Sequence, residues 1–252
     1  MATPTINEYE EQRAYHMSAH VLIQLHRGKT VAKAMERSPD TGVFAIGRAA
    51  HTIILEPDQF GLRYCIGGPV NPKTGKCYQA SSKKFRDWSA KEELEGITSD
   101  DASMLLCMRD AIESHTAASQ LLARGVAEQT IRCEYMGFPS QSRLDWVCQH
   151  GIVDIKTTID IVGFPYDIEK YGYHYQAAYY QAVIGINDWL PYYLIAVQKS
   201  SPSQCLVIRL NQHKLDEARR DNETKLESVR SEFFDYLKGK KSCQKLEQSS
   251  TA

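Results

Sequence analysis

Long apolar runs and closely spaced cysteine pairs are both missing from this 252-residue sequence. No stretch approaches the roughly 20 apolar residues of a membrane-spanning helix, so we expect no membrane segment. The first twelve residues, MATPTINEYEEQ, are polar and acidic, unlike a secretory signal. The seven cysteines are scattered and none forms a Cys-x-x-Cys pair. This spacing argues against a zinc ribbon or an iron–sulfur cluster and favours reduced thiols in a cytoplasmic protein.

A strong excess of either charge is missing as well. The net charge is −1, which does not indicate nucleic-acid binding. A local groove can nevertheless be basic while the remaining surface is acidic. The content of 42% hydrophobic and 24% charged residues is typical of globular proteins. We predict one domain over residues 1–240, with its core at about 40–210, and a disordered polar tail over 241–252.

The hydrophobic pattern predicts an alternation of helices and strands. We expect helices over 17–35, 41–56, 100–122 and 167–186, and a long amphipathic helix through residues 215–237. Strands are expected over 130–138, in a hairpin over 142–158, and over 192–198 and 205–210. The order predicts an α/β fold, a mixed central β-sheet flanked by helices, with extra N-terminal helices and a long C-terminal helix.

The hairpin over 142–158 is the most informative stretch. In its second strand, Asp154 and Lys156 share one face, because strand side chains alternate. Asp145 lies on the preceding strand, across the hairpin. Two carboxylates and a lysine on one side of a hairpin are suited to hold a divalent cation next to a phosphate. The plainer interpretation of Asp-x-Lys alone is a solvated strand face.

The helix over 41–56 adds a histidine. Gly47, His51 and Leu55 are spaced at four residues and share a face. Glycine lowers helix stability by roughly 1 kcal/mol relative to alanine. A glycine within a helix therefore needs a reason, and we interpret Gly47 as permitting close approach to a neighbouring element. His51 becomes a metal ligand if this helix packs against the 142–158 hairpin; otherwise it is a histidine bonded to a carbonyl.

Three other patterns have weaker signals. Gln176 and Tyr180 are four residues apart on one helical face, suited to contact phosphates or a water, or simply to pack on the sheet. Glu134 either lies near the hairpin site or is a surface acid. The region 60–99 has a loose basic cluster interleaved with aromatic rings. This pattern is typical of a surface that binds a nucleic-acid strand, or of a solvated loop. The basic residues are Lys73, Lys76, Lys83, Lys84 and Arg86, and the rings are those of Tyr78, Phe85 and Trp88.

Taken together, these motifs resemble the PD-(D/E)XK nuclease superfamily. Its acid, followed by acid-x-Lys on the next strand, matches Asp145 and the run Asp154-Ile155-Lys156. The string G-x-x-x-H-x-x-x-L-E-P at 47–57 and Q-x-x-x-Y at 176–180 resemble the RecB-like branch, and the strings around the hairpin and at 171–180 resemble the RecE-type nuclease domain of exonuclease VIII. Leu144 stands where the family often has proline, and the cluster-binding cysteines of some relatives are missing.

The resemblance implies a metal-dependent exonuclease acting on double-stranded DNA ends. It implies removal of the 5′-ended strand, a RecT-type single-strand annealing partner, and a homo-oligomeric ring around DNA. It assigns Mg²⁺, replaceable by Mn²⁺, to His51, Asp145, Asp154 and the Ile155 carbonyl, the orientation of the water to Lys156, and DNA contact to Gln176 and Tyr180. A structure- or sequence-specific endonuclease and a catalytically dead DNA-binding protein are the alternatives.

Overall fold

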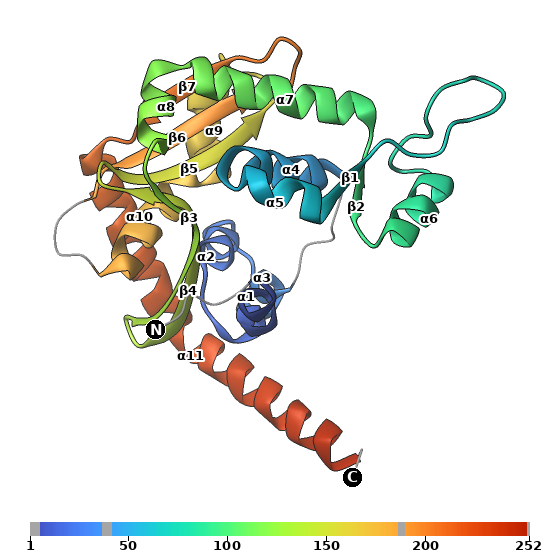
Figure 1. Cartoon of the computed structure of the whole chain (residues 1–252). Helices are drawn as coiled ribbons and strands as arrows, with labels where there is room; N and C mark the ends of the chain where they lie inside the picture. The colour runs from blue at the N-terminus through green and yellow to red at the C-terminus, as the bar shows by residue number, and fades with distance from the viewer. Residues whose placement is uncertain (1–5, 37–41, 186–189, 251–252) are drawn as a thin grey trace.

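A five-stranded mixed sheet forms the centre of the molecule (Figure 1). The computed structural model describes residues 6–36, 42–185 and 190–250. The sheet order is β3 (Gly125–Tyr135), β4 (Phe138–Cys148), β5 (Gly151–Thr158), β6 (Tyr192–Gln198) and β7 (Cys205–Arg209). Only β5 and β6 are parallel neighbours; the other pairs are antiparallel. This confirms the predicted mixed sheet.

Helices cover both faces of the sheet, which gives three layers. One apolar core lies under α2 (Ala19–His26), α3 (Val31–Met35), α10 (Tyr173–Ile184) and α11 (Gln212–Ser250). The other lies under α4 (Gly42–Leu55), α7 (Ser99–Ser114) and α8 (Thr116–Leu122). The other helical segments of the described chain are α1 (Ile6–Gln12), η1 (Arg13–Tyr15), α5 (Pro57–Arg63), α6 (Lys83–Glu92) and α9 (Phe164–Tyr171).

Strand β5 separates the two cores, as its alternation predicted. Ile152 belongs to the core under α10, and Val153 and Ile155 belong to the core under α4. Because side chains alternate, Asp154 and Lys156 share the α10 side with Ile152. Asp154 is 1% exposed, so the plainer interpretation of a solvated Asp-x-Lys face is wrong here.

Several predicted helices are divided by short breaks. The segment 17–35 forms α2 and α3, separated near Gly28, whose φ of +80° favours glycine. Ser18 caps α2 by accepting a hydrogen bond from the Val21 amide, as expected from its position. The segment 100–122 forms α7 and α8, which meet at His115. In the segment 167–186, Gly172 with φ +78° separates α9 from α10.

A long hairpin joins β3 to β4. Its turn has Met136 at φ +52° and Gly137 at φ +74°, the two positive values that a tight two-residue hairpin turn requires. Both strands run for 11 residues, beyond the range 130–138 predicted for the first. The extra length brings Glu128 into the sheet.

Most of the region 60–99, for which the sequence pattern predicted no elements, forms a projection over residues 64–97 that we call the arm. The arm consists of β1 (Tyr64–Ile66), a loop, α6 (Lys83–Glu92) and β2 (Glu95–Ile97), and it extends from the side of the body (Figure 1). Strands β1 and β2 pair in parallel as a separate small sheet.

The C-terminal helix α11 is longer than predicted. It continues to Ser250, so residues 241–250 are helical where the polar composition predicted a disordered tail. The segment has Lys, Gln, Leu and Glu, which are good helix formers, so polarity alone did not argue against a helix. Among the described residues, none of the helices has the length and apolarity needed to cross a membrane.

Candidate metal and catalytic site

Strands β4 and β5 separate at the position of Asp145. Their pairing runs from Cys148↔Gly151 only as far as Trp146↔Val153. Just beyond, the Ile155 amide donates a hydrogen bond to Asp145 Oδ2 at 2.7 Å. The carboxylate therefore satisfies a strand amide that has lost its backbone partner, and this contact fixes Asp145 at the opening between the strands.

Helix α4 places His51 at the same opening. His51 Nε2 lies 3.0 Å from the carbonyl oxygen of Ile155, and Nδ1 lies 3.5 Å from Asp145 Oδ2. When Nε2–H donates to the carbonyl, the lone pair of Nδ1 faces the carboxylate, which is the tautomer that a metal ligand needs. The predicted packing of this helix on the hairpin is confirmed.

The explanation offered for Gly47 is wrong. A Cβ atom at this position would meet nothing within 4 Å, so a close approach of α4 does not depend on a missing side chain there. The packing of α4 instead involves Ala49, Ala50 and Ile53, which are buried in the core under this helix.

Glu128 is a site residue that the sequence interpretation missed. The β3–β4 register passes from Ala127↔Trp146 to Gln129↔Leu144 and omits the pair between them. Glu128 occupies this irregularity with φ +51°, an uncommon value for a residue other than glycine. It forms an ion pair with Arg143 Nε, and its Oε1 lies 3.9 Å from His51 Nδ1.

The signal that reveals Glu128 is its register with Asp145. It lies two residues before the predicted start of the strand, so only the longer observed hairpin brings it opposite the metal site. Glu134 is exposed and pairs with Pro139 beside the hairpin turn, away from this opening.

His51, Glu128 and Asp145 offer a donor set that fits a divalent cation. One ligand atom from each lies within 4.8 Å of the other two. Ions of this kind bind oxygen and nitrogen at about 2.0–2.6 Å, so such atoms can surround one ion. The pKa of Asp145 is raised to about 7, chiefly by burial, with Asp154 and Glu128 adding to the shift and His51 and Lys156 opposing it. A cation would offset this crowding of negative charge.

Asp154 and Lys156 form a second group on the α10 side of β5. Lys156 Nζ lies 2.5 Å from Asp154 Oδ2 and donates to Gln176 Oε1 at 3.1 Å. It also lies 4.8 Å from the centre of the Tyr173 ring. Burial lowers the pKa of Lys156, but Asp154 and Asp145 together outweigh this effect and raise it, so the side chain is an ammonium ion. It serves as a positive hydrogen-bond donor.

Gln176 and Tyr180 support this pair from α10. Gln176 Nε2 donates to Asp154 Oδ1 at 3.3 Å and to the Tyr180 hydroxyl at 3.1 Å. Tyr180 is only 8% exposed and lies beneath the amide. A direct contact with DNA, as predicted for Tyr180, would need an exposed ring. The Tyr180 ring is buried, and its hydroxyl contacts Gln176 instead.

All seven predicted site residues come together around the end of the β4–β5 hairpin. They fall into the two groups described, with Ile155 in the strand between them. Asp154 contacts Lys156 and Gln176, and the three-residue donor set has Glu128 in its place. The Ile155 carbonyl faces His51.

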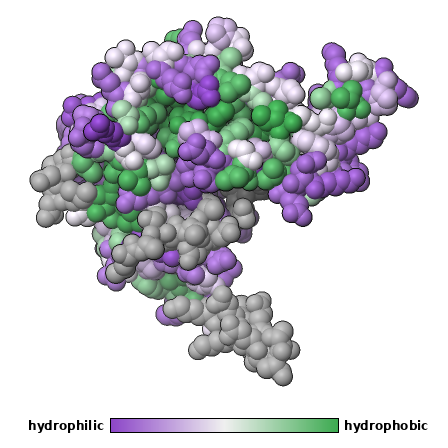
Figure 2. Space-filling view, viewed as in Figure 1, coloured by the Kyte–Doolittle hydropathy of each residue, from purple (hydrophilic) through white to green (hydrophobic). Residues whose placement is uncertain are grey.

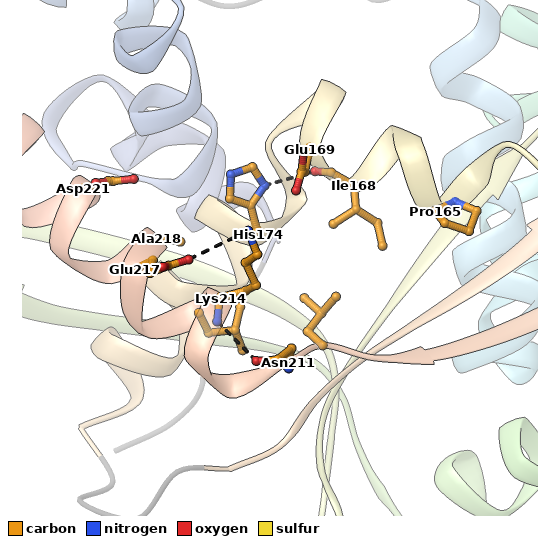
Figure 3. Close-up of a pocket in the computed structure, with 11 residues that line it drawn as sticks. Pro165, Ile168, Glu169, His174, Asn211, Lys214, Glu217, Ala218 and Asp221 are labelled. Atoms are coloured by element: carbon orange, nitrogen blue, oxygen red, sulfur yellow. Dashed lines mark hydrogen bonds and ion pairs between the residues drawn. The ribbon is translucent and has the colours of Figure 1, made fainter.

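A separate groove of about 290 Å³ lies between α9 and the first turns of α11 (Figure 3). None of the predicted site residues lines it. Its charged rim has internal partners: His174 Nδ1 is 3.2 Å from the Ile168 carbonyl, and Lys214 is 3.9 Å from Glu217.

The family of the chain follows from comparison with known proteins. Residues 19–245 match the model of a family described as a PDDEXK-like domain of unknown function (DUF3799). The chain belongs to this PDDEXK-like family. This family implies a divalent metal, and the His51, Glu128 and Asp145 donor set fits one. A search of curated proteins finds no significant match.

One solved structure shares the fold of this PDDEXK-like chain. It comes from Eubacterium rectale and is described as a candidate exonuclease. The two chains are 13% identical, with a TM-score of 0.67 over 94% of this chain and 88% of the other. At this identity the likeness shows a common fold.

Proposed function

We propose that this protein is a metal-dependent exonuclease that hydrolyses phosphodiester bonds at the ends of double-stranded DNA. The observation that carries the proposal is the convergence of a three-residue donor set, His51, Glu128 and Asp145, with a buried Asp154–Lys156 pair. Membership of a PDDEXK-like family and a fold shared with a candidate exonuclease support it.

The two groups have different roles in this proposal. His51, Glu128 and Asp145 would hold the ion, and we propose Asp154 as a further ligand. The Ile155 carbonyl orients His51 by accepting a hydrogen bond from Nε2. Bound there, a divalent cation supplies polarisation of the phosphate and makes a water molecule more acidic. Lys156 donates to the phosphate or the attacking water and stabilises the negative charge that develops during hydrolysis. Gln176 holds the ammonium group in place.

Mg²⁺ is the ion that we propose, with Mn²⁺ as a substitute. Carboxylate oxygens such as those of Glu128 and Asp145 suit Mg²⁺, which retains several waters and shares its ligands with substrate phosphates. The imidazole of His51 is a better ligand for Mn²⁺ than for Mg²⁺, so we expect Mn²⁺ to support activity.

Strand polarity and partners follow from the resemblance to RecE-type nucleases. We propose removal of the 5′-ended strand, which leaves 3′ single-stranded tails for an annealing protein of the RecT type. A ring of several copies around DNA would reconcile a net charge of −1 with DNA binding, since only the channel needs to be basic. Sedimentation with and without duplex tests the ring.

The decisive experiment uses linear duplex labelled at one 5′ end or one 3′ end, with and without a 5′ phosphate. With Mg²⁺, we expect early release of the 5′ label as mononucleotide, while the 3′ label stays in a long strand. A covalently closed circle should remain intact. Cutting of the circle would instead indicate an endonuclease, and the absence of any Mg²⁺- or Mn²⁺-dependent hydrolysis would indicate a DNA-binding protein without activity.

A further inference from the structure

The arm contains a concentration of positive charge that the candidate site does not use. Between Gly67 and Lys91 the sequence has six lysines and arginines and a single acid, Asp87. This segment therefore carries a net charge of +5, and the whole arm, with Glu92, Glu93 and Glu95 at its base, carries +2 in a chain whose net charge is −1. The space-filling view shows mainly hydrophilic side chains over α6 (Figure 2).

The loop of the arm is a small ribbon with a defined tip. Val70 and Cys77 form an antiparallel bridge, and the Asn71 amide donates to the Lys76 carbonyl at 2.8 Å. At the tip, the Asn71 side chain accepts a hydrogen bond from the Lys73 amide at 2.9 Å. These bonds present Lys73 and Lys76 on an ordered turn.

A satellite core holds this ribbon against α6. Phe85 is 2% exposed and packs edge-on against Trp88, with ring centres 5.2 Å apart. Added Cβ atoms at Gly68 and Gly96 would lie 2.6 and 2.8 Å from the Phe85 ring, so both glycines allow the ring to sit between the ribbon and β2. The basic side chains therefore belong to a ribbon and a helix that are held together by packing around Phe85.

The basic residues at the tip lack internal counter-charges. Lys73 and Lys76 are exposed, and neither has an ion-pair partner among the residues that the structure describes. Lys83, by comparison, forms an ion pair with Asp87 at 2.7 Å. Exposed lysines without acids nearby are suited to an anionic partner, because no internal ion pair has to break before they contact phosphates and release counterions.

The base of the arm is anchored to the helix that carries His51. Arg48 Nη2 on α4 lies 2.7 Å from Glu95 Oε1 on β2, and Arg48 is one turn before His51. The Gly67 amide also donates to the Ile97 carbonyl at 2.9 Å, which closes the base. The base of the arm is thus attached to α4 one turn from His51.

We propose that the arm binds the phosphate backbone of duplex DNA next to the segment that enters the site, with Lys73 and Lys76 as its outermost contacts. This inference rests on the proposed function, since the site supplies the reason for duplex to be present. The contact is electrostatic and independent of base sequence, because the tip offers ammonium groups and no bidentate fork for base edges.

The test is the salt dependence of duplex binding, measured by fluorescence anisotropy in EDTA so that no hydrolysis occurs. For Lys73→Gln/Lys76→Gln, loss of two phosphate contacts should reduce the slope of log K against log [NaCl] by about 1.8, at about 0.9 per contact. Lys73→Glu/Lys76→Glu should weaken binding further. Thermal unfolding and circular dichroism verify that each variant is folded.

A matched control removes the same charge from another surface. Lys214→Gln/Arg220→Gln alters two exposed residues of α11, which packs on the opposite face of the sheet from α4. Its slope should equal that of the wild type. Equal slopes for the wild type and both tip variants, or an equal loss in the control, would overturn the inference. Failure of the wild type to bind or hydrolyse duplex would instead contradict the proposed function itself.

Discussion

The candidate site and the arm use charge in opposite ways. In the site, the side chains of Asp154 and Lys156 are 2% and 17% exposed, and each has specific partners. In the arm, Lys83 is 83% exposed, and Lys73 and Lys76 lie at an ordered tip facing solvent. Buried charges have fixed positions and strong local effects, whereas exposed charges act over a Debye length and are screened by salt. The buried charges of the site are therefore suited to catalysis, and the exposed lysines of the arm are suited to attracting an anionic partner.

The largest effect is expected from the donor set. Asp145→Asn removes a charged oxygen ligand, so Mg²⁺ affinity and hydrolysis should both fall by about 100-fold or more. Asp154→Asn should also lower both, and it additionally releases Lys156. Isothermal calorimetry measures the affinity. Unchanged metal affinity in both variants would contradict their assignment as ligands.

Lys156→Ala should separate chemistry from binding. The lysine is not a ligand, so we expect hydrolysis to fall by about 10²–10³-fold or more, while metal and duplex affinities remain near those of the wild type. Single-turnover cleavage and anisotropy measure the two properties. A variant that cleaves at a rate close to the wild type would remove Lys156 from the mechanism.

Glu128→Gln tests the residue that only the structure revealed. The amide retains the size of the side chain but loses its charge, so metal affinity should fall by about 10- to 100-fold. Glu134→Gln on the same strand is the matched control, because Glu134 is exposed near the hairpin turn, and it should behave as the wild type. Equal metal affinity for both variants would show that Glu128 serves only Arg143.

Gly68→Ala should disturb the arm and leave the site in place. Its φ is +126° and the new Cβ would lie 2.6 Å from the Phe85 ring, so we expect a local cost of about 1–3 kcal/mol. Hydrogen exchange should increase within residues 67–96 and remain unchanged around the β4–β5 hairpin. Gly75→Ala, at φ +67° with nothing within 4 Å of the new Cβ, is a control for backbone strain without a clash. Faster exchange throughout the sheet would mean that the arm is part of the main core.

The smallest effect concerns a titration away from both regions. The pKa of His20 is lowered to about 4, chiefly by burial, with Arg13, Lys29 and Arg27 contributing to the shift. The unfolded chain therefore binds the extra proton between pH 6.5 and about 4, so the stabilising effect is complete above pH 6.5 and is lost as the pH falls. After allowing for partial exposure, the change is about 1–2 kcal/mol. Urea unfolding of His20→Gln should show a correspondingly flatter pH profile; identical profiles would refute this.

The sequence predicted the parts of the molecule that depend on local periodicity. Alternation placed Asp154 and Lys156 on one face of β5, and the spacing of apolar residues located the principal helices. The placement of His51 required one further assumption, that its helix packs on the hairpin, and this was correct.

The parts that escaped prediction depend on contacts between distant residues. Glu128 enters the site at a local break in the β3–β4 pairing, where its φ is +51°, and no periodic pattern reveals such a break. The arm is held by Phe85 between two glycines 28 positions apart in the chain. Gly47 was misinterpreted because helix propensity says nothing about which neighbour, if any, a glycine faces.

The chain connectivity of the sheet implies an order in which the two halves of the site can form. Strands β3, β4 and β5 are joined by tight turns, so Asp145 can meet the Ile155 amide after closure of a very short loop. Pairing of β5 with β6 joins Ile152 to Tyr192 and requires the whole crossover through α9 and α10. Contacts between such distant residues slow folding. Gln176 lies 20 residues from Lys156, against ten between Asp145 and Ile155, so we expect the aspartate to be held in position before the lysine is fixed.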